Sequence, residues 1–266
     1  MKKRFQISNY TRLLRIGQWY KNLLIFIPLL FAMPGEVHTL PSLIIGFICF
    51  CAVSSITYMI NDWVDREADR LHPTKKNRPL ASGEISGKTA IIIGIILSLI
   101  VISGSFYLGS FYAYIVATYF IMTNAYSLGL KNIPVLDLII IAGNFMLRTL
   151  AGMTIFTDTH SLPYFVGIFS VIIIFLTHKR RSDIKLLGGE AAAHKPVLKF
   201  YTERNSYLIR LLGYLGIFYA AYILYTDGTS LQKLIPILAL VIFISTLLSK
   251  KPHLAINPHH IFKKRI

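Results

Sequence analysis

The residues best suited to chemistry form an acidic run directly after an apolar stretch, Asn61-Asp62-Trp63-Val64-Asp65-Arg66-Glu67-Ala68-Asp69-Arg70. In a helix, positions 62, 65 and 69 share one face, and position 61 is one turn before 65. Carboxylate and amide oxygens suit Mg²⁺, which commonly shares phosphate oxygens with a substrate. We therefore predict a Mg²⁺ site with Asn61, Asp62 and Asp65 as ligands, and we assign Asn61 and Asp69 to substrate binding. The alternative is a solvated helix end whose acids pair with the two arginines of the run.

Basic residues follow the acidic run, in the segment His72-Pro73-Thr74-Lys75-Lys76-Asn77-Arg78-Pro79-Leu80-Ala81-Ser82-Gly83. Cations beside a metal-binding acidic face suit a polyanionic ligand that bridges metal and base. We assign Lys75 and Arg78 to phosphate contact and catalysis, and Arg66 to substrate binding. For Lys76, phosphate contact and the general excess of positive charge on cytoplasmic loops are equally good explanations.

A second charged cluster, His178-Lys179-Arg180-Arg181-Ser182-Asp183, follows a later apolar stretch. In isolation such a run is usually a solvated helix end. If the chain has two related halves, however, Asp183 faces the first acidic run across a central cavity and completes the metal site. Lys179 and Arg180 would then bind the substrate.

Two further features lie close to or within apolar stretches. Tyr126 and Lys131 place a phenol and an amine near the same cytoplasmic entrance. Arg148 lies inside a stretch that would span a bilayer, and a buried arginine needs an anionic partner. Asp137 and a ligand phosphate are the two alternatives for that partner.

The elements that must position these residues are apolar helices. Of 266 residues, 54% are hydrophobic and only 15% are charged, whereas a soluble domain usually has about 25% charged residues. Segments this long and apolar can only be helical within a bilayer, so we predict an all-α membrane protein. The predicted spans are 18–33, 41–60, 88–108, 111–130, 133–153, 162–178, 207–226 and 231–249, after an interfacial segment, 1–17.

Lysine and arginine set the predicted orientation. If the spans alternate, nearly all of the 28 basic residues fall on one side, with both termini, the loops 61–87 and 179–206 and the basic tail 250–266. We predict that this side faces the cytoplasm, in a bacterial inner membrane. Topology thus explains the net charge of +16, and we expect no nucleic-acid partner. Cys49 and Cys51, inside a span, are expected to be inert buried thiols.

The motif Asn61-Asp62-x-x-Asp65-x-x-x-Asp69, together with Tyr126-Ser127-x-x-Leu130-Lys131, resembles the UbiA superfamily of intramembrane prenyltransferases. Further segments resemble its decaprenyl-phosphate phosphoribosyltransferase branch: Gln18-Trp19-x-Lys21-Asn22, His72-Pro73-x-Lys75-x-x-Arg78-Pro79-x-Ala81-Ser82-Gly83, Phe145-x-x-Arg148-x-x-Ala151-Gly152 and Lys179-Arg180-Arg181-Ser182-Asp183. The family usually has nine spans, and this chain shows eight.

The resemblance implies one UbiA-like helical bundle, residues 1–266, around a central cavity open to the cytoplasm. It implies Mg²⁺-dependent transfer of a phosphoribosyl group from 5-phosphoribosyl 1-diphosphate to a polyprenyl phosphate in the membrane lipid, with inversion at C1. Asp62, Asp65, Lys75 and Arg78 would be catalytic. Lys21, Lys131 and Arg148 would hold the lipid phosphate or the ribose 5-phosphate, and homo-oligomer formation stays open.

Two other functions compete with this one. An aromatic prenyltransferase shares the first acidic motif, but it would have paired acids near Asp183, which this chain lacks. A lipid or ion transporter would keep its function after Asp62 and Asp65 are replaced by asparagine.

Overall fold

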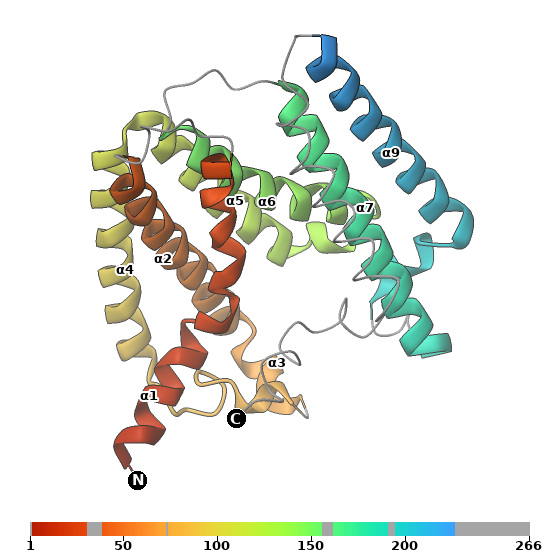
Figure 1. Ribbon diagram of the computed structural model, residues 1–266. Coiled ribbons are helices and arrows are strands. Elements are labelled where there is room, and N and C mark those ends of the chain that lie inside the picture. Colours follow the sequence, from red (N-terminus) through yellow and green to blue (C-terminus); the bar gives the residue numbers. More distant parts are fainter. Residues whose placement is uncertain (1, 31–38, 73, 156–161, 191–194, 227–266) are drawn as a thin grey trace. The chain divides into compact units, whose positions relative to one another are not determined.

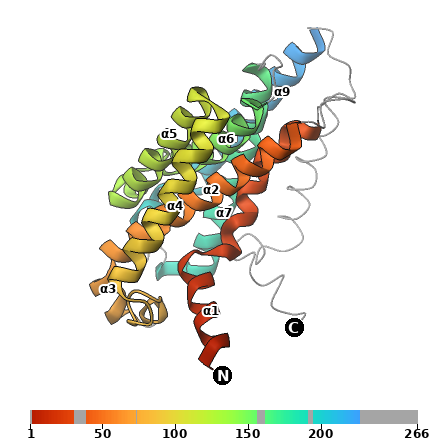
Figure 2. The same cartoon turned by 90° about the vertical axis from the view of Figure 1, so that its left-hand side faces the viewer.

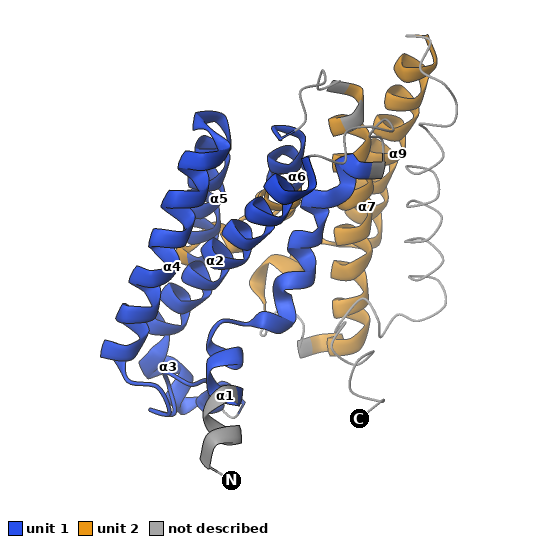
Figure 3. Ribbon diagram, turned by 60° about the vertical axis from the view of Figure 1, so that its left-hand side comes forward, with its two compact units in different colours: residues 1–127, 147–157 blue, residues 128–146, 158–266 orange. Residues whose placement is uncertain are grey.

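The computed structural model describes residues 2–30, 39–72, 74–155, 162–190 and 195–226, and every regular element in these ranges is a helix (Figure 1). The elements divide into two compact units (Figure 3). Unit 1 consists of residues 1–127 and 147–157, and unit 2 of residues 128–146 and 158–266.

Unit 1 contains the N-terminal helices and the acidic run. Its elements are α1 (Lys2–Leu13), the 3₁₀ helix η1 (Ile16–Leu30), α2 (Leu40–Val64), α3 (Arg66–Leu71), the short 3₁₀ helix η3 (Lys75–Asn77), α4 (Gly87–Leu108), α5 (Ser110–Leu128, to residue 127) and the second part of α6 (Leu136–Met153). Local chemistry explains the ends of α4. The Ser86 side chain accepts a hydrogen bond from the Thr89 N–H, a standard N-cap, and Gly109, with φ of 99°, separates α4 from α5.

The helices correspond to the predicted stretches in order. Those expected at 41–60, 88–108, 111–130, 133–153, 162–178 and 207–226 are all α-helices, while the one expected at 18–33 is η1. Pro28 lies inside η1 and lacks the N–H that a regular helix needs. The stretch expected at 231–249 lies outside the described residues. The number of spans stays a prediction.

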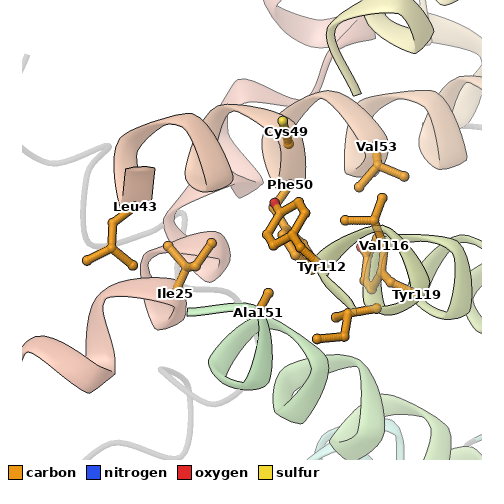
Figure 4. Close-up of a cluster of buried hydrophobic side chains, with 10 residues drawn as sticks. Ile25, Leu43, Cys49, Phe50, Val53, Tyr112, Val116, Tyr119 and Ala151 are labelled. Carbon is orange, nitrogen blue, oxygen red and sulfur yellow. The ribbon is translucent and has the colours of Figure 1, made fainter. Parts of the chain in front are cut away.

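The main core of unit 1 joins η1, α2, α5 and the second part of α6 (Figure 4). The Phe50 ring packs edge-on against Tyr112, with centroids 6.2 Å apart. Close backbone approach tightens the packing further. A Cβ added at Gly152 would lie 2.0 Å from the Ile25 carbonyl oxygen, so only glycine fits there. Small residues serve the same purpose between helices in membranes.

A smaller core fixes the surroundings of the acidic run. Leu13 of α1, Met59 of α2, Leu80 and Ile85 of the following loop, and Ala90 of α4 are buried together. Burying apolar side chains is worth about 25 cal/mol per Å². This core therefore holds both the end of α1 and the basic loop against the end of α2.

Unit 2 is built on two long helices, α7 (Leu162–Leu187) and α9 (Glu203–Thr226), which lie side by side in Figures 1 and 2. Glycines again allow the contact, because a Cβ at Gly213 would lie 2.6 Å from Ile174 Cγ1. The first part of α6 and three short 3₁₀ helices complete the described part of the unit, namely η4 (Leu130–Asn132), η5 (Gly188–Glu190) and η6 (Pro196–Phe200). Its buried core comprises Leu138, Ala142, Leu176, Val197 and Tyr201.

Within the described part of the chain, α2, α4, α6 and α9 have both the length and the apolar composition that crossing a bilayer requires. On α4, large apolar side chains such as Ile91, Leu99 and Phe106 are exposed. Soluble monomers rarely expose large contiguous apolar patches to water. The surface of α4 is therefore suited to lipid.

Candidate functional site

The acidic cluster, defined as Asn61, Asp62, Asp65 and Asp69, lies where α2 passes into α3. Asp65 is the joining residue, and its N–H still donates to the Asn61 carbonyl oxygen at 3.0 Å. The acidic run, expected to lie on one helix, is therefore divided between α2 and α3, but the helical hydrogen bonding continues through Asp65. Asp62 and Asp69 are buried, with 2% of each residue exposed, while Asn61 and Asp65 are half-buried.

Two arginines from outside the acidic run neutralise the buried acids. Arg78 Nη1 lies 2.6 Å from Asp69 Oδ2 and 3.1 Å from Asp62 Oδ1. Arg15 Nη2 lies 2.5 Å from the same Asp62 oxygen. An unpaired buried carboxylate would cost several kcal/mol, and these ion pairs offset that cost for Asp62 and Asp69.

The remaining polar contacts of the run are local. Asn61 Nδ2 donates to Asp65 Oδ2 at 3.1 Å, as their spacing predicts. Arg66 and Arg70 both contact Glu67, at 3.2 and 2.8 Å. The helix-end alternative expected these two arginines to neutralise the acids of the cluster, but Asp62 and Asp69 are neutralised by distant arginines.

The donor set of the acidic cluster fits a hard divalent cation. A single guanidinium nitrogen of Arg78 already contacts both Asp62 and Asp69, so their oxygens converge on one positive charge. Among the described residues, no group of three or more His, Cys, Asp or Glu side chains is placed to hold a metal. Mg²⁺ does not require one, because it usually takes one or two carboxylates and completes its shell with water and phosphate oxygens.

The other predicted residues of unit 1 lie at varied depths. Lys75 begins η3 and is exposed. Lys21, on η1, is half-buried, with its amine 5.9 Å from the centre of the Tyr20 ring. Tyr126 is half-buried near the end of α5. The structure thus joins Arg78 directly to the acidic cluster.

Arg148 lies deep in unit 1, with 5% of the residue exposed. Its Nε donates to Asn22 Oδ1 at 2.7 Å, and its Nη2 donates to the Tyr119 hydroxyl at 2.8 Å. The guanidinium carbon also lies 4.6 Å from the centre of the Tyr119 ring, a favourable cation–π distance. Ser54 extends this polar group, because its hydroxyl is 3.2 Å from that of Tyr119. Arg148 is therefore held firmly inside an apolar core.

Unit 2 contains its own charged group, the buried triad Asp137, Arg180 and Tyr201. Arg180 Nε donates to Asp137 Oδ2 at 3.0 Å, and Nη2 lies 2.9 Å from that oxygen as an ionic contact. The Tyr201 hydroxyl donates to Asp137 Oδ1. Asp137, considered above as a partner of Arg148, thus forms an ion pair with Arg180. Burial and the bond to Asp137 raise the pKa of the Tyr201 phenol above its usual range.

Other charged side chains surround the buried triad. Arg180 Nη1 lies 3.8 Å from Asp183 Oδ2, and Lys179 and Lys131 are half-buried. Burial, together with the charge of Arg180, lowers the pKa of Lys195 to about 8. Asp183 belongs to unit 2, so its role in the metal site stays a prediction.

Sequence reasoning missed several of these partners. Arg15 was assigned only to the interfacial segment, and Tyr119 and Tyr201 were not singled out. Asn22 appears in the sequence analysis only as the last residue of the motif Gln18-Trp19-x-Lys21-Asn22, with no role assigned. One signal pointed to Arg15, since clustered carboxylates repel unless positive charge lies among them, but spacing alone could not select an arginine 47 residues before Asp62.

Comparison with known proteins now adds to this geometry. Residues 22–257 match the UbiA prenyltransferase family. The chain belongs to this family. A structure of a UbiA homolog from Archaeoglobus fulgidus bound to DMAPP and Mg²⁺ aligns with a TM-score of 0.61 and 19% identity, over 91% of this chain and all of that one. At this identity, the likeness supports the fold.

Two curated relatives are decaprenyl-phosphate phosphoribosyltransferases. That of Mycolicibacterium smegmatis is 31% identical over 76% of this chain and 64% of its own length. That of Corynebacterium glutamicum is 35% identical over 71% of this chain and 58% of its own. The alignments thus span less than two thirds of these relatives. Family membership and apolar helices together make the chain an integral membrane protein with the predicted UbiA-like, all-α fold.

Proposed function

We propose that this chain transfers a phosphoribosyl group from 5-phosphoribosyl 1-diphosphate to a polyprenyl phosphate and releases diphosphate. The convergence of Asp62 and Asp69 on Arg78 carries the proposal, because it combines a metal-binding donor set with a phosphate-binding cation. The names of the two curated relatives support this choice of donor and acceptor. Both termini and the acidic cluster would face the cytoplasm of a bacterial inner membrane, where a soluble donor meets a lipid acceptor.

In this mechanism, the acidic cluster would hold the Mg²⁺ that accompanies the donor's diphosphate. When bound, Mg²⁺ would neutralise charge on the diphosphate and so make it a better leaving group. Asn61, Asp62 and Asp65 would hold the cation, with Asp69 beside them. Arg78 and Lys75 would stabilise the negative charge that develops as the diphosphate departs. Asp183, Lys179 and Arg180 remain predicted members of the site.

The lipid phosphate would act as the nucleophile. One of its oxygens attacks C1 of the ribose from the face opposite the diphosphate, and the C1–O bond to the diphosphate breaks with its electron pair. The configuration at C1 is therefore inverted. The lipid phosphate is already ionised at neutral pH, so no general base is required. Lys21, Lys131 and Arg148 are the proposed cations for this phosphate or for the ribose 5-phosphate.

Prenyl transfer to an aromatic acceptor is the second candidate, because the solved relative from A. fulgidus holds DMAPP, a prenyl diphosphate, and Mg²⁺. The deciding assay compares two donors with the same purified protein. One reaction contains labelled 5-phosphoribosyl 1-diphosphate, Mg²⁺ and polyprenyl phosphate, and the other contains a labelled prenyl diphosphate, Mg²⁺ and 4-hydroxybenzoate. We expect label in the lipid product of the first reaction, and its loss when EDTA removes the metal. Label only in the second reaction would establish prenyl transfer instead.

A further inference from the structure

Arg15 reaches the acidic cluster from the junction between α1 and η1. Its backbone has a φ of 49°, a left-handed conformation that few residues other than glycine adopt. Hydrogen bonds fix the turn on both sides, from the Arg15 N–H to the Arg12 carbonyl oxygen at 3.2 Å and from the Gln18 N–H to the Arg15 carbonyl oxygen at 2.7 Å. The sequence-based assignment to a membrane-interface segment does not explain this geometry.

The Arg15 side chain covers Asp62 from the solvent side. Its guanidinium contacts the Asp62 carboxylate at 2.5 Å, and 26% of the Arg15 side chain is exposed against 3% of that of Asp62. The guanidinium carbon also lies 4.4 Å from the centre of the Tyr58 ring, one turn earlier on α2. A ligand approaching from solvent can therefore reach the arginine more easily than the acid, and the aromatic ring supports the arginine independently of Asp62.

The charges of the acidic cluster and its two arginines indicate what changes when a metal and a diphosphate bind. The buried acids Asp62 and Asp69 are balanced by Arg15 and Arg78, and the half-buried Asp65 adds one further negative charge. A divalent cation bound alone would leave a net positive charge beside buried side chains, which is unfavourable. A diphosphate that arrives with the cation restores the balance. Guanidinium groups bind such oxygens in a bidentate manner.

We propose that Arg15 is a diphosphate-binding residue that masks Asp62 in the ligand-free protein and transfers to the diphosphate when a divalent cation takes Asp62. This inference rests on the proposed function only in that the donor is a metal–diphosphate, and it holds for either transferred group. This exchange of partners by Arg15 favours the joint binding of metal and diphosphate, because each ligand offsets the charge that the other adds.

The experiment measures two affinities of the full-length protein in detergent. Mn²⁺ alone is titrated by electron paramagnetic resonance, and pyrophosphate is titrated by calorimetry in saturating Mg²⁺. In Arg15→Gln, we expect Mn²⁺ to bind more tightly because its competitor is gone, and pyrophosphate to bind about tenfold more weakly, about 1.4 kcal/mol. The matched control is Arg12→Gln, which removes the same charge from a neighbouring arginine paired with Glu84. The control should change neither affinity.

Opposite changes in Arg15→Gln distinguish ligand binding from a structural role. Two weakened affinities, or two unchanged ones, would overturn the inference. If Arg15→Gln fails to fold, Arg15→Lys decides, because lysine keeps the charge but lacks the planar fork. It should weaken pyrophosphate binding and leave Mn²⁺ binding unchanged, and equal effects on both would reject the role. Because the probe is pyrophosphate, failed phosphoribosyl transfer with intact pyrophosphate binding would reject the proposed function and leave this inference standing.

Discussion

The acidic cluster of unit 1 and the buried triad of unit 2 both pair carboxylates with arginines, but they differ in access. Arg15 and Arg78, which pair with the acidic cluster, each keep about a quarter of the side chain exposed, at 26%. In the triad, the side chains of Arg180 and Asp137 are 6% and 0% exposed. An exchange of partners with a ligand is therefore far easier in the cluster than in the triad.

This difference indicates two uses of the same ion pair. Partly exposed guanidinium groups can leave a buried carboxylate for phosphate when a cation takes their place, because the carboxylate is then not left unpaired. A desolvated pair held by a third hydrogen bond, such as the one from Tyr201, is costly to separate. We therefore expect substitutions in the acidic cluster to affect binding and catalysis, and those in the buried triad to affect stability.

The largest expected effect comes from Asp137→Asn. It leaves the charge of Arg180 buried without its partner, which should lower the free energy of unfolding by about 3–5 kcal/mol. Denaturation in detergent micelles measures this loss. Asp183→Asn is the control, since its contact with Arg180 is longer, at 3.8 Å, and it should have a much smaller effect on stability. Equal stability of Asp137→Asn and wild type would break the distinction between the two regions.

Asp62→Asn tests whether the acidic cluster serves catalysis and not stability. Loss of this carboxylate should lower the transfer rate by about 10²–10³-fold, with little change in the unfolding midpoint. The transfer assay with labelled donor measures the rate. Glu67→Gln serves as the control, because Glu67 is an exposed acid nearby whose contacts are with Arg66 and Arg70. An Asp62→Asn protein that keeps its function would instead support a transporter.

Tyr201→Phe tests whether the Tyr201 hydroxyl, the third group of the triad, stabilises buried Asp137. Removing the hydroxyl leaves one oxygen of buried Asp137 without this donor, at a cost of about 1–3 kcal/mol in unfolding free energy. Tyr207→Phe, at an exposed position on α9, should be neutral in the same measurement. A loss of transfer rate without a loss of stability would place Tyr201 in the catalytic machinery.

The last prediction concerns pH. The pKa of Lys195 is about 8 in the folded protein and 10.5 in its ordinary state, so the unfolded chain binds more protons between these values. The free energy of unfolding should therefore rise with pH from about 8 to 10.5. Lys195→Met should flatten this rise in unfolding midpoints measured across the range. The charges that act on Lys195 are those of Arg180, Asp137, Asp183 and Lys179.

Sequence alone determined the helical class and the membrane character, because long apolar stretches have one stable form in a bilayer. It also located the acidic run and Arg78, since local spacing and charge suffice to indicate a polyanion site. The contact between Asn61 and Asp65 followed from helical periodicity. Each of these inferences depends on residues close together in the chain.

Which charges meet depends on how the chain folds in three dimensions. Arg15 and Asp62 are 47 residues apart, and Asp137 and Arg180 are 43 apart. No periodic pattern links residues at such separations. Their pairing follows from apolar packing, such as that of Leu13 and Leu80 beside Met59, which brings the arginines to the acids. The polar partners are thus selected by how the hydrophobic surfaces fit, and that fit depends on the whole chain.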